Sequence, residues 1–443
     1  MNKSTRNVLT FKNGIHPDCH GKELSETAAV KIAPLLGRYT VLAAQNAGQA
    51  PEIVVKPGDK VKKYQLLAQA SGFVSANLHS PTSGEIKGII EVPGPMGIPA
   101  RAIEIISDGL DEALAPLPEI DWKNADSKTL LERISACGLV GMGGASFPTH
   151  VKLAPPPEKK IDTLILNGAE CEPFLTADHR LMLEDPHSVL SGTAIAGKIL
   201  GIERLFIGIE TNKINAMEEL QKYAGDYGID IVPLKVQYPQ GSEKHLINAV
   251  TGRVVPENGL PMDAGCVVHN AATASAIADA VIRGLPLIER ITTITGSVVK
   301  TPGNWKMRIG TPVIEAIRLA DGVTEEPGKL ILGGPMMGFA QKSFDVPVSK
   351  STSGILLLSR KQAVNYVSGN CIRCGRCVQG CPMRLLPCAI ASAVESYRFD
   401  LALKEHVNNC IECGACAYVC PAKRPLVQHN RRAKAELRRQ IRK

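Results

Sequence analysis

The last quarter of the chain contains two cysteine motifs with the same spacing. Each reads C-x2-C-x2-C-x3-C-P, first from Cys371 to Pro382 and again from Cys410 to Pro421. This run binds [4Fe-4S] clusters, and where two runs are paired the fourth cysteine of one ligates the cluster of the other. Three thiolates on a tight loop converge on three irons, and the proline ends the loop.

The pairing of the two runs predicts which cysteines share a cluster. One cluster is expected on Cys371, Cys374, Cys377 and Cys420, and the other on Cys410, Cys413, Cys416 and Cys381. Zinc is the alternative, but structural zinc sites use C-x2–4-C couples with four ligands per ion. Two full runs with Cys-Pro ends favour clusters, which carry electrons one at a time.

Length and composition indicate a multidomain globular protein. The 443 residues suffice for about three domains of roughly 150 residues each, with 44% hydrophobic and 21% charged residues. No apolar run approaches the roughly 20 residues that span a bilayer, and the first residues lack the apolar core of a signal peptide. The five cysteines outside the motifs are scattered, as expected of reduced thiols in the cytoplasm. They are Cys19, Cys137, Cys171, Cys266 and Cys388.

The positive charge lies at the C-terminus. The formal net charge is +8, and residues 421–443 hold nine Lys or Arg and one acid, so residues 1–420 are neutral. This distribution argues against a nucleic-acid-binding face. Residues 426–443 are interpreted as a basic tail, typical of a solvated helix end. The alternative is a contact with anionic lipid headgroups or with an acidic partner.

The first 110 residues predict a leader followed by a small β domain. Residues 1–37 are irregular, and His16, Cys19 and His20 are interpreted as a chance cluster rather than a metal site. Residues 38–110 contain short β-branched runs separated by Gly and Pro, which predict a barrel-sandwich-like β domain. The turns in it resemble those of lipoyl and biotinyl carrier domains. No lysine occurs between Lys63 and Lys87, so a structural role is expected.

Residues 127–290 alternate helical and strand patterns, which predicts an α/β layered domain. Its candidate site begins with a glycine loop that contains Gly141, Gly143 and Gly144, with Lys152 beyond it. Glycines let backbone N–H groups close on a phosphate, and a lysine supplies a counter-charge. A tight turn without a ligand is the alternative, because the loop does not follow a predicted strand.

Polar residues follow predicted strands of the same domain, where open α/β sheets bind ligands. Asn, Glu and Thr at such positions can hydrogen-bond the ring edge and ribityl hydroxyls of a flavin, although each alone could cap a loop. The residues concerned are Asn167, Glu170, Glu172, Gly208, Glu210, Asn270 and Thr273.

The rest of the chain is divided into three further parts. Residues 291–346 predict a β-grasp-like module, in which Gly333–Gly338 forms a turn between domains or lines the flavin. Residues 347–369 are interpreted as a linker, and residues 370–425 as a ferredoxin-like helical domain with two clusters. The predicted fold is therefore a multidomain mixture of α/β and α+β parts.

The whole chain resembles the C subunit of the Rnf (also called Rsx) electron transport complex. The resemblance is carried by Gly14–Pro17, the turn Ser80–Gly84, the segments Gly141–Leu153 and Asn167–Arg180, Gly333–Phe339 with Asp345–Pro347, and both cysteine motifs. It implies a peripheral subunit on the cytoplasmic side of the inner membrane. Its partners there would be the other subunits, including a ferredoxin-like one, of an ion-translocating complex that couples NAD(H) and ferredoxin.

The α/β domain is also similar to the NADH-oxidising subunit of respiratory complex I. That resemblance implies that Gly141, Gly143, Gly144, Lys152, Asn167 and Glu170 contact FMN. It implies that Phe147 and Glu172 contact the nicotinamide nucleotide. Met142, Ile209 and Ala272 stand where that subunit has charged residues, so this site has lost charge.

Together these features predict a subunit that passes electrons between NAD(H), FMN and two [4Fe-4S] clusters. No side chain is needed as an acid or base, so no catalytic residue is predicted. One alternative is a stand-alone flavin and iron–sulfur reductase of the corrinoid-reductase type. The other is an electron-transfer adaptor that binds no nucleotide.

Overall fold

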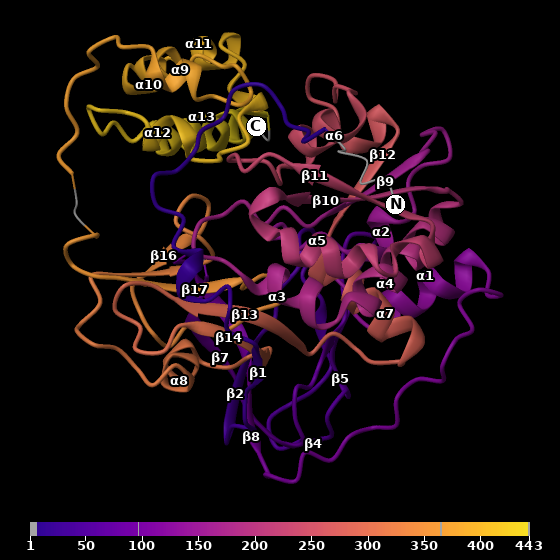
Figure 1. Cartoon of the computed structure of the whole chain (residues 1–443). Helices are drawn as coiled ribbons and strands as arrows, with labels where there is room; N and C mark the ends of the chain where they lie inside the picture. Colours follow the sequence, from indigo (N-terminus) through magenta and orange to yellow (C-terminus); the bar gives the residue numbers. More distant parts are fainter. Residues whose placement is uncertain (1–6, 96, 364–365, 442–443) are drawn as a thin grey trace.

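The computed structural model describes residues 7–95, 97–363 and 366–441. Figure 1 shows the cysteine-motif helices gathered at one end of the molecule, beside the α/β layers, with the N-terminal β strands at the opposite end. None of the described helices combines the length and the apolar character needed to cross a membrane.

Two small antiparallel sheets form the N-terminal β domain, as the turn pattern predicts. One sheet has the order β2 (Arg38–Leu42), β8 (Pro99–Ser107), β7 (Gly84–Pro93) and β4 (Lys60–Val61). The other joins β3 (Glu52–Ile53), β5 (Leu66–Gln69) and β6 (Leu78–His79). Val41, Leu67 and Ile103 belong to the apolar core between the two sheets.

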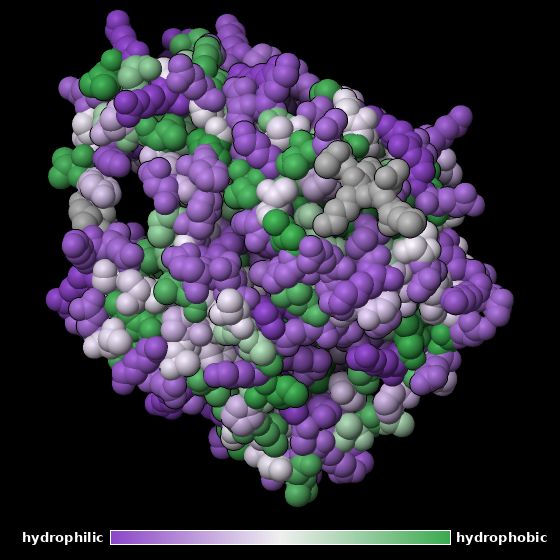
Figure 2. Space-filling model, in the orientation of Figure 1, coloured by the Kyte–Doolittle hydropathy of each residue, from purple (hydrophilic) through white to green (hydrophobic). Residues whose placement is uncertain are grey.

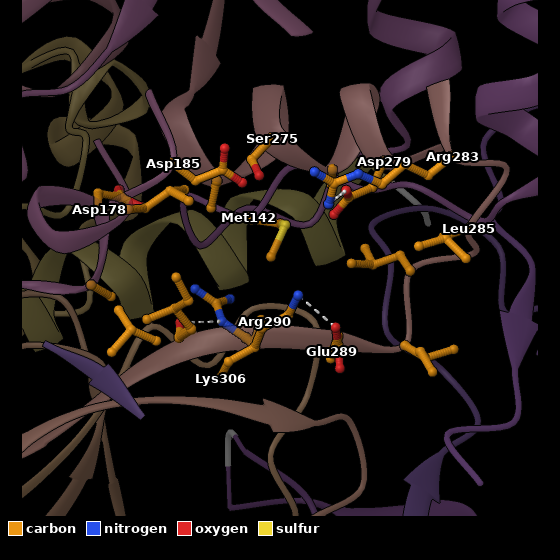
Figure 3. Close-up of a pocket in the computed structure, with 18 of the residues that line it drawn as sticks. Met142, Asp178, Asp185, Ser275, Asp279, Arg283, Leu285, Glu289, Arg290 and Lys306 are labelled. Carbon is orange, nitrogen blue, oxygen red and sulfur yellow. Dashed lines mark hydrogen bonds and ion pairs between the residues drawn. The ribbon is translucent and has the colours of Figure 1, made fainter. Parts of the chain in front are cut away.

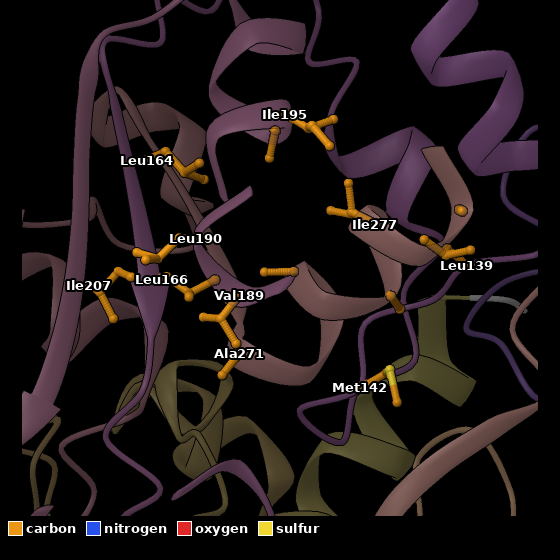
Figure 4. Close-up of a cluster of buried hydrophobic side chains, with 14 of the residues drawn as sticks. Leu139, Met142, Leu164, Leu166, Val189, Leu190, Ile195, Ile207, Ala271 and Ile277 are labelled. Atoms are coloured by element: carbon orange, nitrogen blue, oxygen red, sulfur yellow. The ribbon is translucent and has the colours of Figure 1, made fainter. Parts of the chain in front are cut away.

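A parallel sheet with helices on both faces forms the α/β domain. Its order is β11 (Ile229–Leu234), β10 (Arg204–Glu210), β9 (Thr163–Asn167) and β12 (Cys266–Asn270). One face packs on α1 (Ser127–Ala136), α4 (Pro186–Leu200), α5 (Ile214–Gln221) and α7 (Ala271–Ile282), and the other on α6 (Glu243–Thr251). Successive residues of β9 alternate between these two cores, and Leu164 and Leu166 face the larger one (Figure 4).

A six-stranded mixed sheet follows and reaches beyond the predicted 291–346 module. Its order is β1 (Val30–Ile32), β14 (Gly303–Arg308), β13 (Glu289–Thr295), β17 (Gly354–Leu358), β15 (Lys329–Leu332) and β16 (Phe339–Gln341), with α8 (Val313–Leu319) packed on it. The prediction of a linker at 347–369 is wrong at β17, whose apolar residues fill an interior position. The predicted leader likewise contributes the edge strand β1.

The described part of the C-terminal domain contains five α-helices, which are α9 (Arg376–Gln379), α10 (Pro387–Glu395), α11 (Phe399–Lys404), α12 (Ala415–Tyr418) and α13 (Leu426–Ile441). The basic stretch is not a free tail. Ala433 and Leu437 of α13 are buried in one core with Ile390 of α10, because apolar residues recur at helical spacing between the basic ones. The domain therefore continues to residue 441, and residues 442–443 lie outside the described part of the chain.

Candidate functional site

The glycine loop lies between α1 and α2 (Thr149–Lys152) and is closed at its base. Gly141 N–H donates to Phe147 O over 2.8 Å, and Met142 N–H donates to Thr273 Oγ1 over 2.9 Å. Gly143 and Gly144 are exposed at the tip. Gly144 has a φ of 111°, and the space where its Cβ would lie is open. The tip therefore presents backbone to solvent in a form suited to a phosphate.

The ends of β9 and β12 lie beside this loop. Asn167 and Asn270 are paired in register at those ends, and a Cβ on Gly143 would lie 3.2 Å from Asn270 Cβ. Asn270 Oδ1 accepts from the N–H of Ala272 over 3.0 Å, and its Nδ2 donates to Asp178 over 2.5 Å. The structure thus brings the glycine loop and the polar strand ends to one edge of the sheet.

Glu170 and Glu172 follow β9, and backbone N–H groups hold their carboxylates. Glu170 accepts from Asp178 N–H over 2.8 Å at the start of α3 (Ala177–Glu184). Glu172 accepts from Met336 and Met337 N–H over 3.2 and 2.7 Å, so the turn 333–338 belongs to this site. Burial raises the pKa of Glu172 to about 7. Burial, and then the Glu170 carboxylate, raise the pKa of Asp178 to about 7 as well.

Two buried lysines that are not predicted from the sequence lie under these carboxylates. Lys22 comes from the leader, and its Nζ donates to the carbonyl oxygens of Glu172 over 2.9 Å and Leu175 over 2.5 Å. Burial, and then the nearby Lys213, lower the pKa of Lys22 to about 8. Lys213 Nζ donates to Ala169 O over 2.7 Å. Neither lysine belongs to a motif, so no sequence signal marks them.

Three of the predicted cofactor residues support the site from inside. Gly208 is enclosed, since a Cβ there would lie 2.8 Å from Leu234. Glu210 is 1% exposed and lies 3.6 Å from Lys213 Nζ. Thr273 is fully buried and holds the glycine loop through Met142.

Lys152 lies at the rim, where it pairs with Glu243. Phe147 is partly buried, and its carbonyl closes the glycine loop. Lys152 also lowers the pKa of the neighbouring His269, which burial depresses most. The buried His269 Nε2 has no hydrogen-bond partner among the described groups.

These residues fit a phosphorylated flavin. The open glycine tip can donate N–H groups to a phosphate, and the unpartnered His269 Nε2 leaves a polar atom for a ligand. Two buried lysines beneath the strand ends favour an anionic group there. Bound FMN would supply the ability to take a hydride and release single electrons.

A cavity of about 270 Å³ lies behind the glycine loop. Figure 3 shows Met142, Asp178 and Ser275 on one side of it, and Arg290 and Lys306 of the six-stranded sheet on the other. Arg290 is buried and donates to Lys350 O over 2.5 Å. Asp178 therefore contacts Asn270 at the sheet edge and also faces this cavity.

The eight motif cysteines line two separate cavities. The first, of about 150 Å³, is lined by Cys371, Cys374, Cys377, Cys420 and also Cys388; we call it the outer cavity. The second is lined by Cys381, Cys410, Cys413 and Cys416; we call it the inner cavity. Each holds the four thiols grouped by the motif pairing, three from one run and the fourth from the other. This donor set fits a [4Fe-4S] cluster.

Of the trio His16, Cys19 and His20, the two histidines contact each other. Among the described residues, no three His, Cys, Asp or Glu side chains are arranged to hold a single metal ion. The rings of His16 and His20 pack against each other, with their Nε2 atoms 3.3 Å apart.

The inner cavity is joined to the α/β domain by Tyr238. Its Oη donates to Cys413 O over 2.7 Å, and its backbone exchanges hydrogen bonds of 2.8 and 2.9 Å with Ile15 of the leader. Ile15, Cys171, Tyr238 and Cys413 share one small apolar cluster. The contact therefore links the candidate flavin site to the inner cavity.

Four family models match the chain in succession. They are the "RnfC Barrel sandwich hybrid domain" over 9–110, the "Nuo51 FMN-binding domain" over 134–279, the "SLBB domain" over 291–340 and the "4Fe-4S dicluster domain" over 363–429.

Relatives that match nearly the whole chain are named as C subunits of ion-translocating oxidoreductase complexes. The C subunit of a proton-translocating ferredoxin:NAD(+) oxidoreductase complex from Clostridium ljungdahlii is 47% identical, covering 97% of this chain and 94% of that protein. The C subunit of a Na(+)-translocating complex from Acetobacterium woodii is 44% identical, covering 98% of each. An NAD+-reducing [NiFe]-hydrogenase structure covers 70% of this chain and 63% of that chain, with a TM-score of 0.51 and 16% identity. That likeness is one of fold.

Proposed function

Since the chain belongs to the RnfC family, the C subunits of ion-translocating ferredoxin:NAD(+) oxidoreductase complexes, we propose that it transfers electrons between NAD(H) and a ferredoxin-type partner. FMN in the α/β domain and two [4Fe-4S] clusters are the cofactors. A flavin is required because a hydride carries an electron pair, whereas each cluster accepts one electron. The arrangement that supports this proposal best is the inner cysteine cavity joined to the α/β domain through Tyr238.

The residues that would hold FMN are those at the edge of the parallel sheet. The backbone N–H groups of Gly143 and Gly144, at the tip of the glycine loop, would donate to the phosphate. Gly141 and Lys152 would lie beside them. Asn167, Glu170 and Asn270 would face the flavin, while Gly208, Glu210 and Thr273 support the edge from inside. Phe147 and Glu172 would contact the nicotinamide nucleotide.

The outer cavity would exchange electrons with the partner. Cys371 and Cys374 are exposed there, together with the basic Arg373 and Arg376 and the apolar Ile372. An exposed cluster site edged by positive charge is suited to an acidic redox protein. The inner cavity then lies between the flavin and this surface.

The chain would act as a peripheral subunit on the cytoplasmic side of a membrane-associated complex. Exposed Arg438 and Arg439 on α13 would meet anionic lipid or an acidic subunit. For its organisation we propose a β domain at 38–110, a flavin domain at 127–290, a β-grasp module that takes in β1 and β17, and a cluster domain ending at 441.

The proposal is tested on the isolated chain, purified and reconstituted without oxygen. The visible spectrum should show flavin and iron–sulfur bands, and NADH should bleach both. Gly143→Leu should lose flavin and keep its clusters, because its side chain would meet Asn270. Gly225→Leu is the control, since nothing lies within 4 Å of a Cβ there.

Three outcomes would count against the proposal. An absence of bleaching by NADH would support the adaptor without nucleotide binding. Full NADH:acceptor turnover by the isolated chain, unchanged by the other subunits, would support the stand-alone reductase. Retention of flavin by Gly143→Leu would show that the flavin binds at another site.

Glu172→Gln should raise the KM for NADH while flavin content stays unchanged.

A further inference from the structure

The outer cavity contains a fifth thiol. Cys388 lies at the second position of α10 and lines the cavity with Cys371, Cys374, Cys377 and Cys420. Cys388 packs in one small cluster with Cys377 and Cys420, and its thiol interacts electrostatically with that of Cys377. Cys388 is therefore adjacent to one predicted cluster ligand without belonging to either motif.

The position beside the inner cavity that corresponds to Cys388 is occupied by a residue that can only pack. Cys388 follows Cys381 by seven residues, and Val427 follows Cys420 by the same seven. Val427 lines the inner cavity as Cys388 lines the outer one. Because valine fills the position in one half of the domain, a thiol in the other half adds chemistry that packing does not need.

A buried guanidinium also points to an anion in the outer cavity. The side chain of Arg424 is 6% exposed and lines the cavity, where it interacts electrostatically with Cys371. Its Nη2 donates to Glu395 over 2.6 Å, but the buried Nη1 has no hydrogen-bond partner among the described protein groups. A buried donor of this kind calls for an acceptor, and a cluster held by four thiolates is anionic.

We propose that Cys388 is a reserve ligand of the outer cluster, placed to take over the iron bound by Cys377. In the exchange, the iron–sulfur bond to Cys377 breaks and a bond from iron to Cys388 Sγ forms. The proton released by the Cys388 thiol balances the proton taken up by the freed Cys377 thiolate. No electron is gained or lost. The exchange would keep the outer cluster bound when the bond to Cys377 is lost. Such a loss is expected at this cluster, because its ligands Cys371 and Cys374 are exposed to solvent. This inference rests on the proposed function only in requiring a cluster in the outer cavity.

The test compares matched single substitutions in the two halves of the domain. Each variant of the full chain is reconstituted without oxygen. Iron and sulfide are assayed per chain, and the reduced protein is examined by low-temperature EPR. We expect about eight irons in the wild type and in Cys377→Ala, but about four in Cys416→Ala, whose site has no fifth thiol. Cys377→Ala/Cys388→Val should fall to about four.

The single variant Cys388→Val separates a reserve ligand from a structural residue. It should keep both clusters, because the normal ligands are present and valine fits the matched position. If Cys377→Ala loses its cluster as fully as Cys416→Ala does, or if Cys388→Val alone loses one, the reserve-ligand proposal is overturned. A wild-type chain that takes up no cluster iron would instead overturn the proposed function itself.

Discussion

The outer and inner cysteine cavities are lined by matching positions of the two motif runs, but their surroundings differ. In the outer cavity Cys371 and Cys374 are exposed, whereas Cys413 and Cys416 of the inner cavity are each only 7% exposed. The inner cavity is joined to the α/β domain by the hydrogen bond from Tyr238 to Cys413 O. The shared spacing determines which cluster can bind, and the surroundings determine which partner can reach it.

Hydrogen bonding separates the two cavities further. Cys410 Sγ accepts from Asn430 Nδ2 over 3.2 Å and from Glu412 N–H over 3.3 Å. Lys434 of α13 donates to Cys410 O over 2.5 Å. The position that matches Asn430 is Ala391, which offers no side-chain donor. Donors to cluster sulfurs tune reduction potentials, so similar clusters in these cavities should differ in potential.

The strongest test of the comparison removes one ligand from each cavity. With NADH as the electron source, Cys413→Ala should leave the outer cluster oxidised, because the proposed order places the inner cluster between it and the flavin. Cys374→Ala should still allow reduction of the inner cluster. EPR of rapidly frozen samples measures both. Reduction of the outer cluster at the wild-type rate in Cys413→Ala would contradict the proposed order.

A chelator should remove iron from the two cavities at different rates, because solvent reaches them unequally. A chelator such as bathophenanthroline disulfonate should extract iron from the outer cavity about tenfold faster than from the inner one, since two outer ligands are solvent-exposed. Biphasic absorbance loss measures this, and Cys374→Ala, which keeps only the inner cluster, identifies the slow phase. A single phase with equal rates would show that exposure does not govern access.

The contact between the inner cavity and the α/β domain should depend on one hydroxyl. Tyr238→Phe removes the donor to Cys413 O and leaves that buried carbonyl unsatisfied, so the free energy of unfolding should fall by about 1 kcal/mol or more. Tyr418→Phe is the control, because its hydroxyl contacts Asp18 at the exposed surface. Denaturant unfolding measures both variants. Equal losses of unfolding free energy in the two variants would show that the Tyr238 hydroxyl contributes no more than an exposed one.

The smallest expected effect concerns reduction potential. Asn430→Ala should lower the potential of the inner cluster by about 30 mV, because a donor to Cys410 is lost. Ala391→Asn should shift the outer cluster in the opposite direction. EPR-monitored redox titration measures both variants. Unchanged potentials in both would show that exposure, rather than hydrogen bonding, distinguishes the cavities.

Local patterns in the sequence predict much of this architecture. The cysteine spacing predicts which thiols share a cavity, because the two loops and the helices after them are built from nearby residues. The alternation of helical and strand patterns predicted over 127–290 agrees with observed elements such as the strand 163–167 and the helix 271–282. Asn167 and Asn270 come together because the ends of neighbouring strands of one parallel sheet share an edge.

Contacts between distant segments cannot be predicted in this way. Lys22 lies in a stretch without periodicity, and its partners at Glu172 and Leu175 follow about 150 residues later. The strand 354–358 resembles part of a linker in the sequence because its place in the sheet depends on neighbours far away along the chain. The charge of α13 likewise obscures its apolar residues. In each case tertiary packing decides what a local pattern leaves open.

The leader also constrains the order in which this chain can mature. It is synthesised before the segments it contacts, and its hydrogen-bond partners include Glu184, Tyr238, Asn304 and Tyr418. The leader therefore cannot settle until nearly the whole polypeptide has left the ribosome. Since Ile15 packs beside Cys413, a chain without inner-cluster iron should leave the leader loose and open to proteases. The N-terminal segment therefore completes its contacts only after the C-terminal domain has folded.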